Sequence, residues 1–287
     1  MRRKIIVFFF ALCTALYVPA QGRGLLDRCE FLLSAGGMNY GGDLNNQSLL
    51  GQEHLAYSIG VRTTLDNRWA LRANIGTGKI SGGDPDCIEL RNLSFRSTLY
   101  EASVVGEFSF WPYVNGVGSM QGAFYIFCGL CVFHHNPQAS YEISEGEMTW
   151  VDLQPLHTEG QGSVEYPQRK PYLLTQVGVP FGVGFKWQVN KSISLSVEYG
   201  IRKTWTDYLD DVSTTYVSTS ILNSNSTDGH TAALLADRSG EGAPGHVYAE
   251  GVKRGDSSLN DFYTFLHISA GISLDKLLGW TRSKKCN

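Results

Sequence analysis

Apolar and polar residues alternate without a break between positions 192 and 202. Every second position from 193 to 201 is apolar (Ile, Leu, Val, Tyr, Ile), and the positions between them carry Ser, Ser, Glu and Gly, followed by Arg202. Successive side chains of a β-strand point to opposite faces, so this period of two predicts a strand with one apolar and one polar face. The residues that follow, up to Val217, are dense in polar and aromatic side chains. We interpret them as the place where the strand leaves apolar surroundings and enters water.

The same alternation recurs in seven further segments. In the segment 177–188, Val, Phe and Trp side chains alternate mainly with Gly, Lys and Gln. No other internal repeat is visible. The eight predicted strands are, in chain order, 31–40, 55–62, 69–76, 100–110, 124–132, 177–188, 192–202 and 262–274.

The connections between these strands differ in length by parity. Those after strands two, four and six are short, whereas those after strands one, three, five and seven are longer, the last two covering about 135–170 and 203–260. An even strand number with short turns at one end and long loops at the other is typical of an outer-membrane barrel. We therefore predict an all-β fold, an eight-stranded antiparallel transmembrane β-barrel with short periplasmic turns, long extracellular loops and both termini on the periplasmic side. A soluble lipocalin-type barrel is the alternative, but it would place the apolar face inside.

The N-terminus has the pattern of a secretory signal peptide. Arg2, Arg3 and Lys4 precede an apolar stretch at 5–18, and a small-residue cleavage site ends at Ala20. We predict that residues 1–20 are removed and that 21–287 form one barrel domain with a short periplasmic C-terminal tail. The predicted location is the outer membrane of a Gram-negative bacterium.

Composition narrows the classes of partner. The 287 residues carry a net charge of −3, which gives no electrostatic support to a nucleic-acid partner. Beyond the N-terminus no apolar run is long enough for a transmembrane helix. The expected surroundings are therefore outer-membrane lipid. In a barrel only every second residue of a strand faces the lipid, so the sequence shows no long apolar run.

Charged residues recur on the predicted polar faces, which line the barrel interior. Unpaired charges in a narrow lumen are costly, so we predict ion pairs between neighbouring strands and a plugged barrel without a solute channel. A proton or ion path is the functional alternative. The predicted lumen charges are Arg62, Arg72, Glu101, Glu107, Lys186, Glu198 and Arg202.

The cysteines fall into three groups. Cys128 and Cys131 have metal-like spacing, but three residues apart on a strand they face opposite sides. Cys29 and Cys286 lie near the periplasmic ends of the two terminal strands, which adjoin in a closed barrel. An internal disulfide, a mixed disulfide with a periplasmic partner and two free thiols all remain open in this oxidising compartment. Cys87, in the second long loop, has no evident partner.

Candidate catalytic and metal-binding residues are few. His134 and His135 have no carboxylate at metal spacing beside them, and the run with Asp207, Asp210 and Asp211 lacks the Gly and terminal Glu of a calcium loop. We expect those aspartates to be solvated or hydrogen-bonded loop carboxylates. No enzymatic activity, metal or cofactor is predicted.

Six stretches of the chain resemble a known family. They are MNYGGDL (38–44), RNLSFRS (91–97), HHNPQA (134–139), LQPLHTEGQG (153–162), YGIRKTWTDYLDDVSTTYV (199–217) and RGDSSLNDFYTF (254–265). Together they resemble the DUF6089 family of Bacteroidota outer-membrane barrels, which includes the PorG-like components of the type IX secretion system. The most distinctive stretch is a loop motif formed by Thr206, Asp207, Tyr208, Leu209, Asp210, Asp211, Val212 and Ser213. His157 departs from the family pattern, which has Gly there.

The resemblance implies a non-enzymatic anchor or scaffold that associates with the periplasmic PorK–PorN ring of that secretion machine. The segments able to reach a ring are 21–30, 111–122 and the tail 275–287. A surface receptor or adhesin that uses the long loops is the second hypothesis, and a small pore is a remote third. In the barrel picture, Trp205 and Tyr208 mark the outer aromatic girdle, and the polar segment 223–245 is expected to be mobile.

Overall fold

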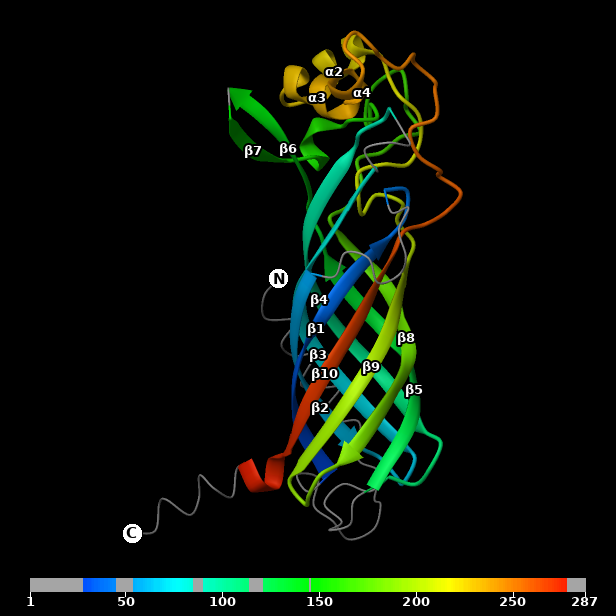
Figure 1. Ribbon diagram of the computed structural model, residues 1–287. Coiled ribbons are helices and arrows are strands. Elements are labelled where there is room, and N and C mark those ends of the chain that lie inside the picture. The colour runs from blue at the N-terminus through cyan, green and yellow to red at the C-terminus, as the bar shows by residue number, and fades with distance from the viewer. Residues whose placement is uncertain (1–27, 45–53, 85–89, 114–120, 145, 278–287) are drawn as a thin grey trace, which may run out of the picture.

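The eight predicted barrel strands are present and form a closed antiparallel barrel. The computed structural model describes residues 28–44, 54–84, 90–113, 121–144 and 146–277, and Figure 1 shows the barrel below a cap of loops and helices. The signal peptide and most of the predicted tail lie outside the described residues. The barrel strands are β1 (Cys29–Gly41), β2 (His54–Thr64), β3 (Trp69–Gly83), β4 (Ser94–Ser109), β5 (Gln121–His134), β8 (Thr175–Gln188), β9 (Ile193–Thr204) and β10 (Phe262–Ser273).

The barrel closes through the first and last strands. β1 pairs antiparallel with β10, Glu30 lying opposite Ser273 and Gly41 opposite Phe262. Each remaining barrel strand pairs with the next in chain order, except that β5 pairs with β8. The connections after β2, β4 and β8 lie at the end where β1 begins and β10 finishes, and the long connections lie at the other end (Figure 1). The short turns after β2 and β8 and the long loops after β5 and β9 therefore lie at the predicted ends, but the connection after β4 (110–120) is about as long as the one after β3 (84–93), because β3 and β4 extend beyond the predicted strands.

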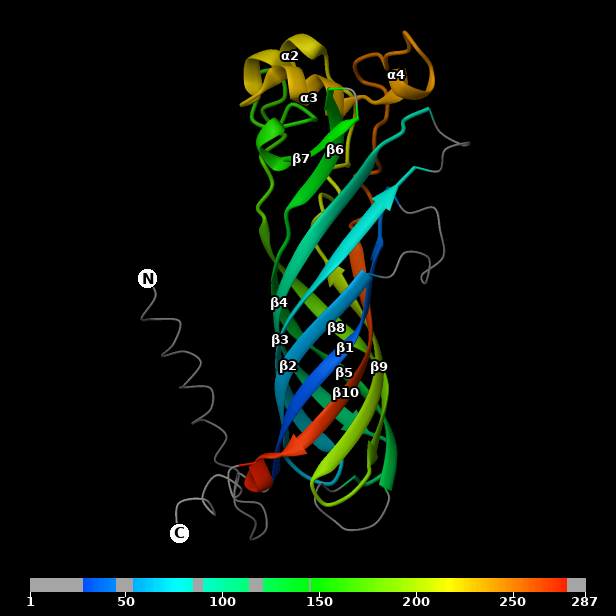
Figure 2. The same ribbon diagram turned by 60° about the vertical axis from the view of Figure 1, so that its left-hand side comes forward.

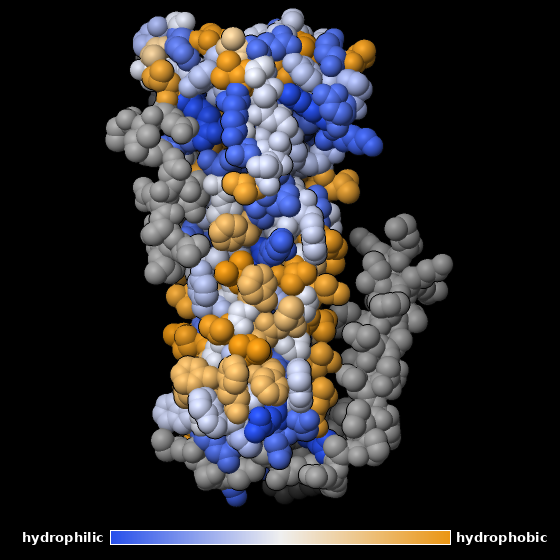
Figure 3. Space-filling model, turned by 90° about the vertical axis from the view of Figure 1, so that its right-hand side faces the viewer, coloured by the Kyte–Doolittle hydropathy of each residue, from blue (hydrophilic) through white to orange (hydrophobic). Residues whose placement is uncertain are grey.

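Apolar side chains cover the outside of the lower barrel. Leu55, Ile75, Leu130 and Ile268 are each more than half exposed. In Figure 3 hydrophobic residues gather over the lower half of the molecule, while the upper half is mostly hydrophilic. A closed barrel with an outward apolar band is how strands satisfy their backbone hydrogen bonds in lipid. The chain is thus an outer-membrane barrel whose belt faces the lipid.

Aromatic side chains border this belt at the short-turn end. Trp69 packs on Phe108 with ring centroids 5.0 Å apart, and Phe124 packs on Phe185 at 4.8 Å. Trp111 lies against Phe124 at 5.9 Å. Such amphipathic rings favour the boundary between lipid and water, so these residues mark the periplasmic edge of the membrane.

The polarity of a single strand inverts along its length. In the lower part of β4, Glu101 and Glu107 point into the lumen and Tyr100 points out; in the upper part, Phe95 and Leu99 are buried inside. The lower strand therefore has the pattern of a membrane barrel and the upper strand that of a soluble one. The strands rise above the lipid, and the main apolar core fills the upper barrel and the cap.

The cap contains regular elements that the sequence pattern did not predict. A hairpin formed by β6 (Pro137–Ser144) and β7 (Glu147–Asp152) extends from β4, followed by the short helix η2 (Gln154–Leu156). The segment 223–245, predicted as mobile, instead contributes to α2 (Thr219–Asn225), α3 (Gly229–Ala236) and α4 (Ser239–Gly242), which lie over the barrel mouth (Figure 2). No helix in the described ranges combines the length and apolarity needed to cross a membrane.

Leu222 and Leu235 explain why the helices are ordered. Both are buried and join the same core as Leu209 and Phe133. This burial gives short helices the tertiary packing that they need, since helices of this length are marginal alone.

Candidate functional site in the lumen and the extracellular cap

All seven predicted lumen charges lie buried inside the barrel. Glu107 is at the centre: its carboxylate lies 3.1 Å from Arg62 Nε, 3.1 Å from Arg72 Nε and 3.2 Å from Lys186 Nζ. These four side chains come from β4, β2, β3 and β8. One carboxylate thus holds three cations that approach from three other strands.

Further carboxylates complete this cluster. Glu198 Oε2 lies 2.6 Å from Arg72 Nη2 and accepts a hydrogen bond from the Tyr125 hydroxyl at 2.8 Å. Glu30 lies 3.3 Å from Arg62 Nη1. Glu30 was missing from the predicted set because β1 starts two residues before the predicted strand.

A second cluster lies nearer the mouth. Arg202 Nε is 3.1 Å from Glu101 Oε2, which also accepts a hydrogen bond from the Tyr263 hydroxyl at 2.9 Å. Beside it His267 Nε2 lies 3.5 Å from Glu198 Oε1. A cavity of about 10 Å³ lies beside this cluster, lined among others by Glu101, Arg202 and His267.

The lumen charges balance. Arg62, Arg72, Lys186 and Arg202 are four positive groups, and Glu30, Glu101, Glu107 and Glu198 are four negative ones, all buried. Buried charges of one sign would cost several kcal/mol each, whereas paired ones are tolerated. The network therefore fills the lower barrel with side chains and leaves little room for a solute.

The cysteines are placed as follows. Cys128 is exposed and Cys131 is buried, so the two face opposite sides of β5 as predicted. Cys29 is buried, with its Sγ 3.2 Å from Thr63 Oγ1. Cys286 and Cys87 lie outside the described residues, so the state of the Cys29 and Cys286 thiols stays a prediction.

The loop motif 206–213 follows β9 and folds back into the barrel mouth. Tyr40, on β1, donates its hydroxyl hydrogen bond to Asp210 Oδ2 at 2.5 Å and lies 3.1 Å from Asp261 Oδ1. Asp261 accepts from the Leu209 backbone N–H at 2.8 Å, and Asp210 accepts from that of Val212 at 2.9 Å. Burial raises the pKa of both carboxyl groups well above the ordinary value.

Glu159 is a buried carboxylate of the cap that accepts several hydrogen bonds. It accepts hydrogen bonds from the Ser213 and Thr214 backbone N–H groups at 2.9 and 3.0 Å and from the Tyr208 hydroxyl at 3.2 Å. Arg254 Nη1 lies 3.0 Å away as its counter-charge. Both charges are almost fully buried, and the pair joins the connection before β8 to the connection between β9 and β10.

Tyr208 differs from the prediction, whereas the aspartates agree with it in part. Tyr208 is not at the membrane boundary: its ring stacks on Tyr172 inside the cap, with centroids 4.9 Å apart. Only Trp205, directly after β9, is exposed. Asp207, Asp210 and Asp211 are all buried, and of the two predicted states, solvated or hydrogen-bonded, Asp210 and Asp211 are in the hydrogen-bonded one.

Asp207 and Asp211 have perturbed acidity. Burial raises the pKa of Asp211 to about 6, although Arg254 and hydrogen bonds from Thr158 and Tyr172 favour its ionised form. Burial raises the pKa of Asp207 to about 7, and the nearby Asp43 adds to the shift. The Ser213 side chain, which favours the ionised form, offsets part of this rise in the pKa of Asp207. Thr206 contributes through its backbone oxygen, which accepts from the Asp261 N–H at 3.0 Å.

Several of the family-like stretches, far apart in the sequence, meet at this mouth. Tyr40 of 38–44 contacts Asp210 of 199–217 and Asp261 of 254–265, and Glu159 of 153–162 contacts Arg254. Arg91 of 91–97 donates to the Asp43 backbone oxygen at 3.0 Å. These residues lie within the family-like stretches, but nothing in the sequence indicated that Glu159 pairs with Arg254.

His134, the last residue of β5, and His135, which follows it, have no metal-like surroundings. His134 Nδ1 lies 3.1 Å from Thr175 Oγ1, and His135 is buried with its ring parallel to that of Tyr172. Burial lowers the pKa of His135 to about 4, so it is neutral at pH 7. Within the described ranges, no group of three or more His, Cys, Asp and Glu side chains is arranged to hold a metal ion.

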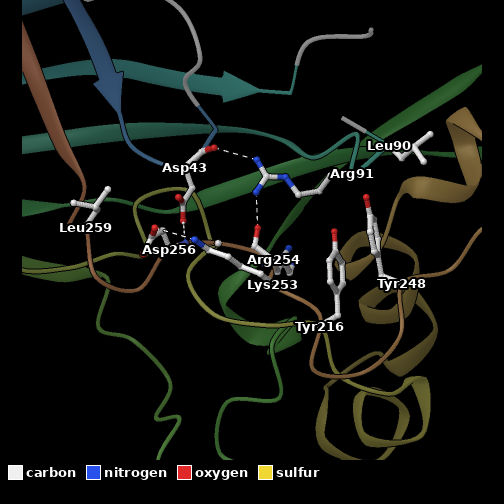
Figure 4. A pocket seen from close by; sticks show the side chains of 10 residues that line it. Asp43, Leu90, Arg91, Tyr216, Tyr248, Lys253, Arg254, Asp256 and Leu259 are labelled. Atoms are coloured by element: carbon white, nitrogen blue, oxygen red, sulfur yellow. Dashed lines mark hydrogen bonds and ion pairs between the residues drawn. The ribbon is translucent and has the colours of Figure 1, made fainter. Parts of the chain in front are cut away.

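A cleft of about 600 Å³ opens beside the mouth. Three connections line it: Asp43 follows β1, Leu90 and Arg91 precede β4, and residues 216–259 follow β9. Figure 4 shows the lining side chains, with the rings of Tyr216 and Tyr248 parallel. The full lining is Asp43, Leu90, Arg91, Tyr216, Tyr248, Lys253, Arg254, Gly255, Asp256 and Leu259.

Comparisons with known proteins add little to this geometry. No protein-family model and no curated protein matches the chain. Among solved structures it is similar to Ail of Yersinia pestis in complex with a heparin analogue (7% identity, TM-score 0.39, 85% of this chain and 96% of that one). It is also similar to Neisserial surface protein A (8%, 0.38, 85% and 96%) and to OprG of Pseudomonas aeruginosa (8%, 0.36, 85% and 94%). At such low identities and TM-scores these similarities carry no information on function.

Proposed function

We propose that the chain is a non-enzymatic outer-membrane anchor or scaffold. The observation that carries this proposal is the closed lumen, in which four buried cations balance four buried carboxylates. A barrel without a solute path acts through the surfaces that it presents at its two ends. In the cap, Asp210, Asp211 and Glu159 each serve as acceptors that hold loops together, which supports a structural role for these carboxylates.

The DUF6089 resemblance supports a more specific role, as a PorG-like component of the type IX protein secretion system with the periplasmic PorK–PorN ring as partner. The periplasmic end would make that contact, through the short turns and the segments that flank β1 and β10. The bonds between the family-like stretches at the extracellular mouth then serve to keep the barrel rigid. Cys29, near the periplasmic start of β1, is a candidate for a covalent link to a partner.

Affinity capture tests the scaffold role. An affinity tag inserted at Gly146, an exposed position in the β6–β7 turn, leaves the periplasmic end untouched. After gentle detergent extraction from the native host, we expect PorK and PorN to co-purify with the tagged chain. An unrelated tagged outer-membrane barrel from the same cells is the control. Capture of neither ring protein by the tagged chain would contradict the proposal.

Two further variants locate the contact. A chain lacking residues 278–287 would lose the ring proteins if the tail docks on them, and retain them if the turns do. Cys29→Ser, compared with wild type on non-reducing gels, would remove a mixed disulfide band if the thiol links to a partner.

A surface receptor or adhesin is the second candidate. The ordered cap favours it, because a cleft framed by three extracellular connections is a suitable binding surface. Deleting the β6–β7 hairpin and the helices α2–α4 would abolish surface binding on this hypothesis, while secretion continues. On the scaffold hypothesis, impaired secretion accompanies loss of the whole chain.

A further inference from the structure

The cleft beside the barrel mouth contains a buried hydroxyl without a partner. Tyr216 is only 2% exposed, and no described group lies within hydrogen-bonding distance of its hydroxyl. Its ring stacks on that of Tyr248, with centroids 4.5 Å apart and planes 12° apart. In Figure 4 both hydroxyls point to the same side, towards Arg91 and Leu90. A buried hydroxyl without a partner is costly, so a ligand that supplies one gains more here than at a solvated group.

The charges of the cleft determine which ligand it accepts. Every cation in the lining already has a carboxylate: Arg91 binds Asp84, Lys253 Nζ lies 2.8 Å from Asp256 Oδ2, and Arg254 binds Glu159. The site therefore offers an anion no uncommitted positive group.

Asp43 is the exception among the acidic groups. In the described part of the chain its carboxylate forms no ion pair, and its recorded hydrogen bond is from the Asp256 backbone N–H, at 2.7 Å from Oδ2. It lies half-buried at the cleft wall. A carboxylate in this position accepts hydroxyl hydrogens and repels phosphate, sulfate and carboxylate ligands.

The remaining wall is apolar. Leu90 and Leu259 line the cleft with 50% and 68% of their surface exposed. The volume of about 600 Å³ falls in the range of small-molecule sites. Hydroxyl partners, an apolar flank, one carboxylate without an ion pair and this size match a sugar, which has both hydroxyl groups and C–H faces. We propose that the cleft binds a neutral saccharide of one or two rings at the cell surface, a binding activity separate from the scaffold role.

A glycan array tests the proposal. The full chain would be labelled and solubilised in a detergent without a sugar head group, then presented to neutral, sialylated and sulfated oligosaccharides. We expect binding to neutral glycans, and the strongest would be titrated by calorimetry. Tyr216→Phe keeps the ring stack and removes the hydroxyl, and Asp43→Asn removes the acceptor charge. Each is expected to weaken binding at least fivefold.

Tyr141→Phe is the matched control. Its hydroxyl also lies in the cap, 3.4 Å from Thr231 Oγ1, but outside the cleft, so its affinity should equal that of wild type. Heat-modifiable migration on gels would verify that each variant barrel is folded. Binding of acidic glycans alone, equal loss in Tyr216→Phe and Tyr141→Phe, a preference for peptides, or no binding would each overturn the proposal. None of these results would affect ring capture, so the two proposals fail independently.

Discussion

Glu107 shows what one residue does in a closed lumen. Its carboxylate contacts Arg62, Arg72 and Lys186 while being fully buried. Sequence alternation was enough to place this side chain inside the barrel, because the parity of a strand decides which way each residue points. It could not say which cations Glu107 meets, since that depends on register and on the lengths of the side chains across the lumen.

Replacing Glu107 by Gln should destabilise the barrel strongly. The change leaves three buried cations with Glu30 and Glu198 as their remaining counter-charges, and removal of one partner of a buried pair costs about 3–5 kcal/mol. Urea unfolding of the detergent-solubilised chain measures the loss. Glu165→Gln, at an exposed position in the loop after β7, is the control and should change little. A similar small loss at both positions would show that the lumen pairs do not contribute.

Asp207 should make the cap sensitive to pH. Its folded-state pKa of about 7 is above the ordinary value of 3.8, so the folded cap holds more protons than the unfolded chain between these values. Cap stability therefore falls as the pH rises from about 4 to 7, by about 1–2 kcal/mol after solvent screening.

The dependence of cap stability on pH can be measured by hydrogen exchange of the amides in 206–217, corrected for intrinsic exchange rates. In Asp207→Asn the slope should be shallower and protection at pH 8 should increase, because the residue can no longer ionise. Asp211, whose pKa is raised to about 6, should maintain part of the slope. Protection that rises with pH, or an identical slope in the variant, would contradict the assignment.

At the scale of elements, the strands follow from local pattern and the cap does not. Period-two alternation survives in each barrel strand because one face meets lipid and the other the lumen. Above the lipid the apolar residues of β4 face inward instead of outward. A pattern of outward apolar residues therefore did not predict the upper part of this strand, 94–99. The helices α2 and α3 were missed for a related reason: their order comes from burying Leu222 and Leu235 on the cap core.

The β6–β7 hairpin should depend on one aromatic contact. The Arg96 guanidinium lies 3.4 Å from the centre of the Trp150 ring, and it joins the hairpin to β4. Trp150→Ala should loosen the hairpin by about 1 kcal/mol, seen as faster hydrogen exchange in 138–152. Met148→Ala, at an exposed position of the same strand, should have a smaller effect. If Trp150→Ala and Met148→Ala increase hydrogen exchange equally, the hairpin is held by its backbone pairing and not by the contact with Arg96.

At the scale of the whole molecule, the barrel is closed inside and capped outside. Balanced charges fill the lower lumen, the apolar core fills the upper lumen, and the cap covers the extracellular mouth. Reconstituted into planar bilayers, the wild-type chain should therefore show no stable conductance steps, matching a detergent-only control. Reproducible steps would show that the lumen admits solutes and would favour the pore hypothesis.

The alternation of the sequence was sufficient to predict the membrane barrel, its eight strands, the end at which its long loops lie and seven of the charged residues that face its lumen, although it missed Glu30. Each of these is a local property, because alternation and loop length are read along the chain. Only the tertiary structure decided that Tyr40, Asp210 and Asp261 meet, that Glu159 pairs with Arg254, and that Tyr208 lies inside the cap rather than at the lipid boundary. The hydrogen-bonded pairs among these residues are 95 to 221 positions apart in the sequence. These residues come together when the cap closes and buries them. The periodicity of the sequence does not indicate which distant loops will be in contact at the barrel mouth.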